Sequence, residues 1–205
     1  MIIDLKTVLQ ENSIIPKGVI HVGGYNGEEI FEYKDLGINN MAIFEPQKNL
    51  YEQILLKKGL DENILAYNFG LGSKTTKQKM YKSINFEAAS SFLQPSKVLS
   101  LYPGLIFEET LEEFEIHKMD DVIKNKNLYN ILNIDVQGFE LEVLRGGEET
   151  LKNIEVIICE VNRDYLYNNN AQIHEIDEFL SAFKFKRLIV NWIGDLWGDA
   201  CYIKC

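Results

Sequence analysis

The chain has few of the residues on which several kinds of site depend. Its 205 residues include only three cysteines, Cys159, Cys201 and Cys205, and no Cys-x-x-Cys pair, so neither a disulfide framework nor a zinc site is indicated. No run of about 18 apolar residues is present, and the first ten residues lack the basic start and apolar core of a signal peptide. We therefore expect a soluble, intracellular (cytoplasmic) protein without a membrane span.

Basic residues are also scarce. Lys and Arg number 21 against 31 Asp and Glu, which gives a net charge of −10. Nucleic-acid-binding domains normally carry a basic patch for the phosphate backbone. Nucleic acid is therefore a poor candidate partner, and the acidic balance favours an uncharged small-molecule or glycan acceptor. The length suits a single domain over residues 1–205, and the sequence leaves the oligomeric state open.

Strand-like and helix-like segments alternate from residue 18 to the end of the chain. This alternation is typical of βαβ units around a parallel sheet. We predict a mostly parallel seven-stranded sheet with helices on both faces and an antiparallel terminal hairpin. The predicted strands are 18–23, 41–45, 64–69, 130–135, 154–160, 186–190 and 200–205, the main helices 27–36, 48–58 and 172–183, and a turn spans 192–198.

Two further segments stand apart from this alternation. Between the third and fourth strands lie roughly sixty residues, far more than a usual connection. They include short strand candidates at 79–82 and 114–118, and we interpret residues 83–113 as a loop or lid over the ligand cleft. The segment 2–12 has apolar residues at helical spacing, which predicts a helix covering either the cleft or a partner subunit.

A glycine-rich turn follows the first predicted strand. Gly23, Gly24 and Gly27 permit a tight strand-to-helix turn whose main-chain amides can face an anionic or carboxylate group. The dinucleotide pattern Gly-x-Gly-x-x-Gly is not met; Gly23, Tyr25 and Gly27 instead follow a Gly-x-Gly-x-Gly spacing in which Tyr25 replaces the central glycine. The turn indicates a nucleotide cofactor, although an ordinary tight turn would also explain these glycines.

An acid follows the second predicted strand. Glu45 stands about twenty residues after the glycines, where a carboxylate can accept hydrogen bonds from both ribose hydroxyls of a nucleoside. A helix-start acid is the alternative interpretation. The third strand is followed by Asn68, Gly70 and Leu71, which we expect to line an adenine pocket unless they form a plain turn. Because the glycine turn and Glu45 occur together at this spacing, the prediction of a nucleoside cofactor is stronger than either feature alone would make it.

Acids also end the next two predicted strands. Asp135 lies where a buried strand meets a helix, at the edge where open α/β sheets bind ligands. It is the first candidate for a general base, and Glu160 is the second. Each could instead be a structural or helix-capping acid, and Asp135 a cofactor ligand. In a variant, Asp135, Glu160 and Asn162 chelate Mg²⁺ to acidify a diol, although no spacing demands a metal.

Together these motifs resemble the FkbM family of S-adenosylmethionine-dependent methyltransferases, from about residue 18 to residue 205. The matching segments are Val-Gly-Gly-Tyr-Asn-Gly at 22–27, Phe-Glu-Pro at 44–46, and NIDVQGFELEVLRGG at 133–147. The family's usual form of the last motif is Lys-Ile-Asp-Val-Glu-Gly, from which Asn133 and Gln137 depart. Ser90-Ser91 and Met119-Asp120-Asp121 also resemble family positions.

The resemblance implies a Rossmann-like class I methyltransferase fold, S-adenosylmethionine as cofactor, and O-methylation of a hydroxyl, often on a sugar or polyketide-derived product. Glu45 would meet the ribose. His21 stands where such enzymes more often carry an acid, so Glu28, Glu29 or Asp135 is an alternative partner for the cofactor's amino group. The predicted cofactor contacts are His21, Gly23, Gly24, Tyr25, Gly27, Glu28, Glu45, Pro46, Asn68, Gly70, Leu71, Ser91, Asp135 and Gln137.

Other functions fit the sequence less well. An NAD-dependent oxidoreductase on the same sheet plan is disfavoured by the missing Gly-x-Gly-x-x-Gly and Tyr-x-x-x-Lys patterns, and a hydrolase by the missing Gly-x-Ser-x-Gly. A non-catalytic cofactor-binding partner in glycan processing is a further alternative, since His21 replaces the usual acid. Trp192 and Trp197 could stack on a sugar, but packing in the core or at an interface is the preferred interpretation.

Overall fold

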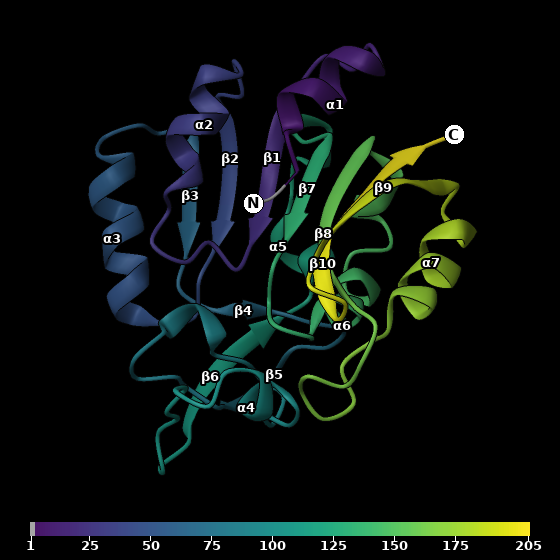
Figure 1. Ribbon diagram of the computed structural model, residues 1–205. Helices are drawn as coiled ribbons and strands as arrows, with labels where there is room; N and C mark the ends of the chain where they lie inside the picture. Colours follow the sequence, from purple (N-terminus) through teal and green to yellow (C-terminus); the bar gives the residue numbers. More distant parts are fainter. Residues whose placement is uncertain (1–2) are drawn as a thin grey trace.

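The computed structural model describes residues 3–205 and contains a seven-stranded sheet with a smaller sheet beyond its carboxyl edge (Figure 1). The order of the large sheet is β3-β2-β1-β7-β8-β10-β9. Neighbouring strands are parallel from β3 to β8, whereas β10 is antiparallel to β8 and to β9. This confirms the predicted architecture. The strands are β1 (Gly18–Val22), β2 (Asn40–Phe44), β3 (Ile64–Tyr67), β7 (Ile131–Ile134), β8 (Val156–Asn162), β9 (Phe185–Ile193) and β10 (Trp197–Lys204).

Helices cover both faces of the large sheet. Alternate residues of a strand point to opposite faces, so Val19 joins one hydrophobic cluster and Ile20 the other. The Val19 cluster receives α1 (Leu5–Glu11), α2 (Glu29–Asp35) and α3 (Lys48–Lys58). The Ile20 cluster receives α5 (Met119–Val122), α6 (Glu140–Arg145) and α7 (Ile173–Ala182). Burial on both faces explains why the central strands are almost continuously apolar.

The helix α1 lies away from the carboxyl edge of the sheet. Asp4 caps its first turn by accepting a hydrogen bond from the main-chain N–H of Thr7 (3.2 Å). Leu5 and Val8 are buried in the Val19 cluster, and α1 packs beside the start of β1 (Figure 1). The prediction that this segment covers the cleft is therefore wrong. Met1 and Ile2, which belong to the same predicted segment, lie outside the described residues.

The terminal hairpin is longer than its sequence predicts. The segment 192–198, predicted as a turn, is largely strand, because β9 continues to Ile193 and β10 begins at Trp197. The turn itself needs only the residues around Gly194, whose φ is +58°. Gly198 suggested a turn in the sequence, but it lies in β10, where a Cβ would collide with the main-chain oxygen of Asn191. Close strand approach, not a reversal, requires this glycine.

The other strand boundaries differ by a few residues. The predicted strand 64–69 ends at Tyr67, and the chain enters the small sheet at Gly70. The predicted strand 154–160 runs to Asn162, so Glu160 lies inside β8 and not at its end. The small sheet contains β4 (Gly70–Leu71), β6 (Glu112–His117) and β5 (Thr76–Met80), in that order.

The segment 83–113 lies beyond the carboxyl edge and is tied to its surroundings. It contains a short 3₁₀ helix, η1 (Glu87–Ala89), and α4 (Val98–Leu101). The main-chain N–H groups of Ser96 and Val98 both donate to the carbonyl of Leu166, at 2.9 and 3.1 Å. Two more 3₁₀ turns lie elsewhere in the chain: η2 (Lys126–Leu128) precedes β7, and η3 (Thr150–Lys152) precedes β8. No helix within residues 3–205 is long and apolar enough to span a membrane.

Candidate active site

Three pockets meet at the carboxyl edge of the large sheet, and Asp135 and Ala88 line all three. We name each pocket by one residue. The Glu45 pocket includes Glu45, Gln47, Leu71, Glu87, Phe92 and Phe139. The His21 pocket includes His21, Glu28, Glu29, Asn133 and Asp199. The Tyr167 pocket includes Phe86, Leu101, Tyr102, Glu160, Tyr167 and Trp197.

The glycine turn after β1 is shaped by close packing. Gly23 has φ +85°, and a Cβ there would collide with the main-chain oxygen of Asp135, so only glycine lets the turn approach the end of β7. Gly24 and Gly27 line none of the three pockets; a Cβ at either would press on side chains such as Ile54. Only Gly23 of the three predicted glycines faces the cleft, where it lines the Glu45 and His21 pockets.

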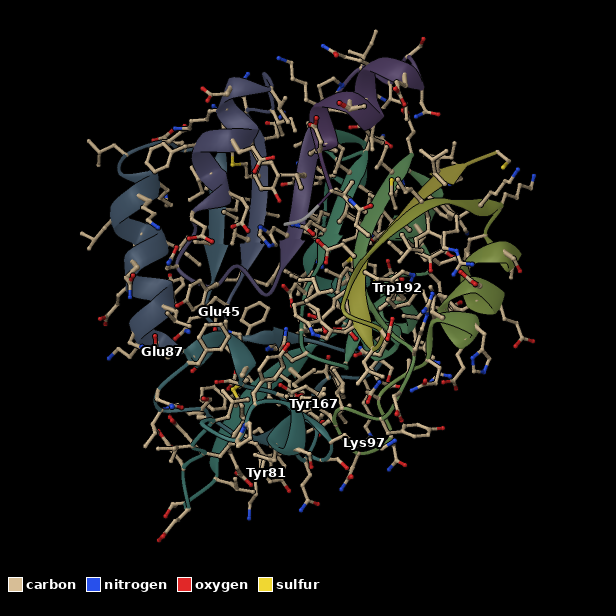
Figure 2. All side chains as sticks on the ribbon, viewed as in Figure 1. Glu45, Tyr81, Glu87, Lys97, Tyr167 and Trp192 are labelled. Carbon is tan, nitrogen blue, oxygen red and sulfur yellow. The ribbon has the colours of Figure 1, made fainter. Side chains whose placement is uncertain are left out.

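Glu45 sits just after β2 and is only 4% exposed. Its Oε2 accepts a hydrogen bond from the main-chain N–H of Tyr25 (3.0 Å), and its Oε1 accepts one from that of Gln47 (2.8 Å). Burial is the largest effect on this carboxyl group and raises its pKa to about 8. Figure 2 shows Glu45 near Glu87, which lines the same pocket. Each carboxyl oxygen retains a further lone pair that can accept a ligand hydroxyl.

Asn68 has a supporting position behind Glu45. Its side-chain amide donates to the main-chain oxygens of Glu45 (3.0 Å) and Pro46 (2.8 Å). Asn68 lines none of the three pockets, so in this structure it fixes the turn after β2. Pro46 itself lines the Glu45 pocket.

The remaining walls of the Glu45 pocket are largely apolar. Gly70 and Leu71 form one side, and a Cβ on Gly70 would lie 2.8 Å from the ring of Phe92. Ser91, which is buried, donates from Oγ to the main-chain oxygen of Gln137 (2.7 Å). This bond ties the segment 83–113 to the turn after β7. An apolar slot beside a buried acid suits a flat heteroaromatic ring joined to a sugar.

His21 belongs to a buried polar cluster in β1, β7 and α2. Its ring nitrogens lie 3.3 Å from the hydroxyl of Tyr33 and 3.3 Å from the Nδ2 of Asn133, which donates to Tyr33 at 2.9 Å. Burial lowers the pKa of His21, so the neutral imidazole is favoured. Three acids, Glu28, Glu29 and Asp199, line the same pocket.

Gln137 joins the two predicted catalytic acids. Its Nε2 donates to Oδ1 of Asp135 (2.7 Å) and to Oε2 of Glu160 (2.8 Å). Gln137 holds a left-handed conformation with φ +53°, which is uncommon outside glycine and often marks a functional site. Its backbone is held by Ser91, and its Oε1 lies 3.3 Å from the hydroxyl of Tyr167.

The two acids differ in exposure. Glu160 is 4% exposed, and burial, followed by the negative charge of Asp135, raises its pKa well above the usual range. Asp135 is exposed to the cleft. Burial therefore favours the protonated form of Glu160, which lies beside the more exposed Asp135.

Glu140, in the motif at 133–147, has a structural role. It is fully buried, and its Oε1 accepts hydrogen bonds from the main-chain N–H groups of Val136 (3.1 Å) and Gly138 (2.9 Å). Burial raises its pKa to about 7. Glu140 therefore holds the turn that follows Asp135.

The cleft is lined by acidic residues and by no basic residue of the Lys or Arg type within the described chain. Of the residues that line the three pockets, none is Lys or Arg. The acids are Glu28, Glu29, Glu45, Glu87, Asp135, Glu160 and Asp199. Such a lining favours a cationic ligand and disfavours an anionic one. Asn162 is buried but lines none of these pockets, and no group of three His, Cys, Asp or Glu within residues 3–205 is arranged to hold a metal.

Several pocket residues were not found from the sequence. Asp199 could have been found from the sequence, because it is an acid in a largely apolar strand. In the structure it lies directly opposite Glu160, where β10 pairs with β8. Tyr167 and Phe86 come from irregular segments that carry no periodic pattern. Trp197 lines the Tyr167 pocket and donates from Nε1 to the hydroxyl of Tyr102 (3.1 Å), whereas Trp192 packs under the guanidinium of Arg163.

The sheet order and the reversed β10 define a Rossmann-like α/β fold, which this chain shares with solved S-adenosylmethionine-dependent methyltransferases. The family model described as "Methyltransferase FkbM domain" matches residues 21–187. The chain therefore belongs to the FkbM methyltransferase family. This membership agrees with the resemblance of the three sequence motifs and disfavours the oxidoreductase alternative.

Comparison with individual proteins supports the same assignment. The chain is 30% identical over 116 residues to the 2-O-methyltransferase NoeI of Sinorhizobium fredii, a match over 56% of this chain and 46% of NoeI, so it spans about half of that relative. Magnesium protoporphyrin IX methyltransferase (ChlM) from Synechocystis PCC 6803, with bound S-adenosylmethionine, has a TM-score of 0.54 at 9% identity, over 98% of this chain and 76% of that one. An rRNA methylase from Streptococcus thermophilus has a TM-score of 0.50 at 11% identity, over 100% and 99%. These two structures show the shared fold.

Proposed function

We propose that the chain transfers a methyl group from S-adenosylmethionine to a hydroxyl oxygen of a sugar or glycan. The observation that carries this proposal is the position of Asp135, which lines the Glu45, His21 and Tyr167 pockets together. A carboxylate at this junction can reach both a bound cofactor and an acceptor. The family membership supports methyl transfer, and a relative named as a 2-O-methyltransferase supports oxygen as the acceptor atom.

The pockets fit S-adenosylmethionine in shape and charge. Glu45 would hold the ribose, with Leu71 and Phe139 beside the adenine. Glu28 and Asp199 would face the amino group. The absence of Lys and Arg from the described pocket lining matches a ligand that carries a positive sulfonium. When bound, this cofactor supplies an electrophilic methyl group.

Asp135 would act as the general base. It accepts the proton of the acceptor hydroxyl as the oxygen becomes a methyl ether. General base catalysis of this kind typically contributes about 10²- to 10⁴-fold in rate. Glu160, held protonated by burial, cannot compete for that proton and donates toward Asp135. Gln137 fixes both carboxyl groups through one amide nitrogen. Accurate placement of the hydroxyl would supply much of the remaining acceleration.

The Tyr167 pocket would receive the acceptor. Trp197 and Tyr102 offer aromatic faces, against which the C–H groups of a sugar ring can pack. Asp135 and Glu160 line the same pocket and can hydrogen-bond sugar hydroxyls. Aromatic walls and acidic hydrogen-bonding groups together favour a sugar over a wholly apolar alcohol.

Calorimetry with S-adenosylmethionine, S-adenosylhomocysteine and NAD tests the cofactor first. We expect both sulfur compounds to bind and NAD to give no heat of binding. Transfer of an isotope-labelled methyl group to a panel of sugars and glycosides then tests the reaction, with the methyl ether located by mass spectrometry. Folded protein that prefers NAD, or that methylates only nitrogen or carbon, would contradict the proposal.

A further inference from the structure

The Tyr167 pocket is larger than a sugar site alone requires. Its cavity volume is about 740 Å³. Asp135, Gln137 and Glu160 line it together, joined by the two hydrogen bonds of the Gln137 amide. Most of the other lining residues are apolar or aromatic and include Phe86, Val98, Leu101, Leu105, Leu166 and Trp197. The pocket thus combines one hydrogen-bonded polar group with a mostly apolar lining.

Exposed apolar side chains continue from this pocket onto the surface. Six of the large hydrophobic residues that are exposed in the described chain come from one short stretch, 84–106: Ile84, Phe86, Leu99, Leu101, Tyr102 and Ile106. Single exposed apolar residues are ordinary, but a cluster beside a binding pocket marks an interaction site. We call this cluster the apolar rim.

The apolar rim rests on a fixed support. Lys97, at the start of α4, forms a 2.5 Å ion pair with Asp164, and Tyr167 donates from its hydroxyl to the main-chain oxygen of Ala89 (2.8 Å). Figure 2 shows Tyr167 and Lys97 on the same side of the molecule, beyond the strand ends. These contacts fix the segment that carries the apolar rim against the segment that carries Asp164 and Tyr167.

The charge of the pocket excludes one group of acceptors. Phosphate binding in proteins uses Arg, Lys or clustered main-chain N–H groups. None of the described residues lining the Tyr167 pocket is Lys or Arg, and its polar group includes Asp135 and Glu160. A phosphate placed there would lose its hydration and meet a like charge. Sugar phosphates and sugar nucleotides are thus poorly matched to the pocket.

We propose that the Tyr167 pocket binds an uncharged glycoside whose aglycone is an alkyl chain. The sugar hydroxyl lies at Asp135, and the alkyl chain runs along Phe86 and Leu101 onto the apolar rim. The inference rests on the proposed methyl transfer to a sugar, and it adds that the acceptor is a finished, non-phosphorylated glycoside. The reaction then follows glycosyl transfer and does not precede it.

Trp197 provides a direct reporter for this binding. The chain has two tryptophans, and Trp192→Phe leaves Trp197 in the pocket as the only one. The fluorescence of this variant is titrated with octyl and methyl glycosides of glucose, galactose and fucose, below the micelle concentration, and with octyl phosphate. We expect an octyl glycoside to bind at least about tenfold tighter than its methyl counterpart, which burial of two methylene groups would supply. Octyl phosphate should bind at least about tenfold more weakly than the octyl glycoside, because an anion meets Asp135.

Substitutions locate the alkyl site. In the Trp192→Phe background, Leu101→Ser and Leu105→Ser should each reduce the octyl preference several-fold while S-adenosylmethionine binding, measured by calorimetry, is unchanged, because both residues line the Tyr167 pocket and neither lines the Glu45 or the His21 pocket. Leu56→Ser is the matched control, because Leu56 is 82% exposed on α3 and lines none of the three pockets, and it should keep the full preference.

Three results would overturn the inference: equal binding of octyl and methyl glycosides or no binding of either, octyl phosphate binding as tightly as the glycoside, or an octyl preference that survives both pocket substitutions. The proposed function fails separately, through loss of S-adenosylmethionine binding or of methyl transfer to any sugar hydroxyl. Cofactor binding and transfer without an octyl preference would therefore reject the alkyl site alone.

Discussion

The main-chain N–H of Tyr25 donates a 3.0 Å hydrogen bond to the side-chain carboxyl of Glu45. This bond joins the turn after β1 to the end of β2, two segments that pair in parallel with Val22 beside Phe44. Tyr25 has a left-handed conformation, φ +46°, which is uncommon for a residue other than glycine. The two sequence motifs are thus held as one unit on the floor of the Glu45 pocket.

Replacement of Glu45 by alanine should weaken S-adenosylmethionine binding by about ten- to a hundredfold, because the two ribose hydroxyls each lose a hydrogen bond that contributes about 0.5–1.5 kcal/mol. The variant also leaves the N–H groups of Tyr25 and Gln47 without this acceptor. Calorimetry measures the dissociation constant. Glu52→Ala, at an exposed position on α3, should bind as the wild type does, and unchanged affinity in folded Glu45→Ala would reject Glu45 as a cofactor ligand.

The pKa of Glu45 predicts a pH-dependent stability. Burial raises it to about 8 from an ordinary value of 4.5, so the folded protein holds a proton that the unfolded chain releases. The resulting stabilisation is complete below about pH 4.5 and is lost as the pH rises through 8, at up to about 1.4 kcal/mol per pH unit. The buried Glu140, with a pKa of about 7, acts in the same direction.

Urea unfolding between pH 5 and 9 measures this loss. Glu45→Gln cannot titrate at this position and still offers one acceptor oxygen for the two N–H groups. Its stability should fall less steeply with pH than that of the wild type. Parallel slopes for the two proteins would show that Glu45 does not carry a raised pKa in the folded state.

Much of the sheet could be predicted because its central strands are buried on both faces. The runs that became β1, β7 and β8 are entirely buried, so their apolar patterns are continuous and their positions clear. Asp135 was found for the same reason, as an acid directly after such a run. Glu45 was found because it follows β2 at a spacing that nucleoside-binding folds share.

The acceptor side could not be predicted in the same way. Tyr167 and Leu101 lie in irregular segments or very short helices, where no period of 2 or 3.6 marks which side chain faces the cleft. Trp197 was expected in the core or at an interface, yet hairpin pairing opposite Asn162 places it at the pocket. These positions depend on long-range contacts that a single sequence does not reveal.

The His21 cluster predicts a cost for removing one hydroxyl. In Tyr33→Phe, the buried Nδ2 of Asn133 loses its 2.9 Å acceptor and His21 loses its 3.3 Å neighbour. An unsatisfied buried polar group costs about 1–3 kcal/mol, which should appear as a lower free energy of unfolding in urea. Tyr165→Phe, at an exposed position, is the control. A Tyr33→Phe protein as stable as the wild type would mean that Asn133 finds another partner.

Glu160 should tolerate replacement by glutamine. Because its pKa is raised well above the usual range by burial and by Asp135, it is protonated near neutral pH, and a glutamine side chain presents the same shape with an N–H donor toward Asp135. The amide oxygen introduced by Glu160→Gln can still accept from Gln137. We expect kcat within about threefold of the wild type for Glu160→Gln and a much larger loss for Glu160→Ala, since the cavity frees Gln137 and Asp135. A large loss in Glu160→Gln would indicate that Glu160 acts as a carboxylate.

Asp135→Asn separates proton removal from binding. The amide keeps the size of the side chain and can offer its oxygen to Nε2 of Gln137, now 2.7 Å from Asp135, so the local structure should persist. It cannot take a proton from the acceptor, and kcat should fall by about 10²- to 10⁴-fold, while the dissociation constant for S-adenosylmethionine changes by no more than a few-fold. Asp195→Asn, in the exposed hairpin turn, controls for the loss of one negative charge. If Asp135→Asn instead weakened cofactor binding strongly and left kcat at saturation intact, Asp135 would be a cofactor ligand, and the proton would leave by another route.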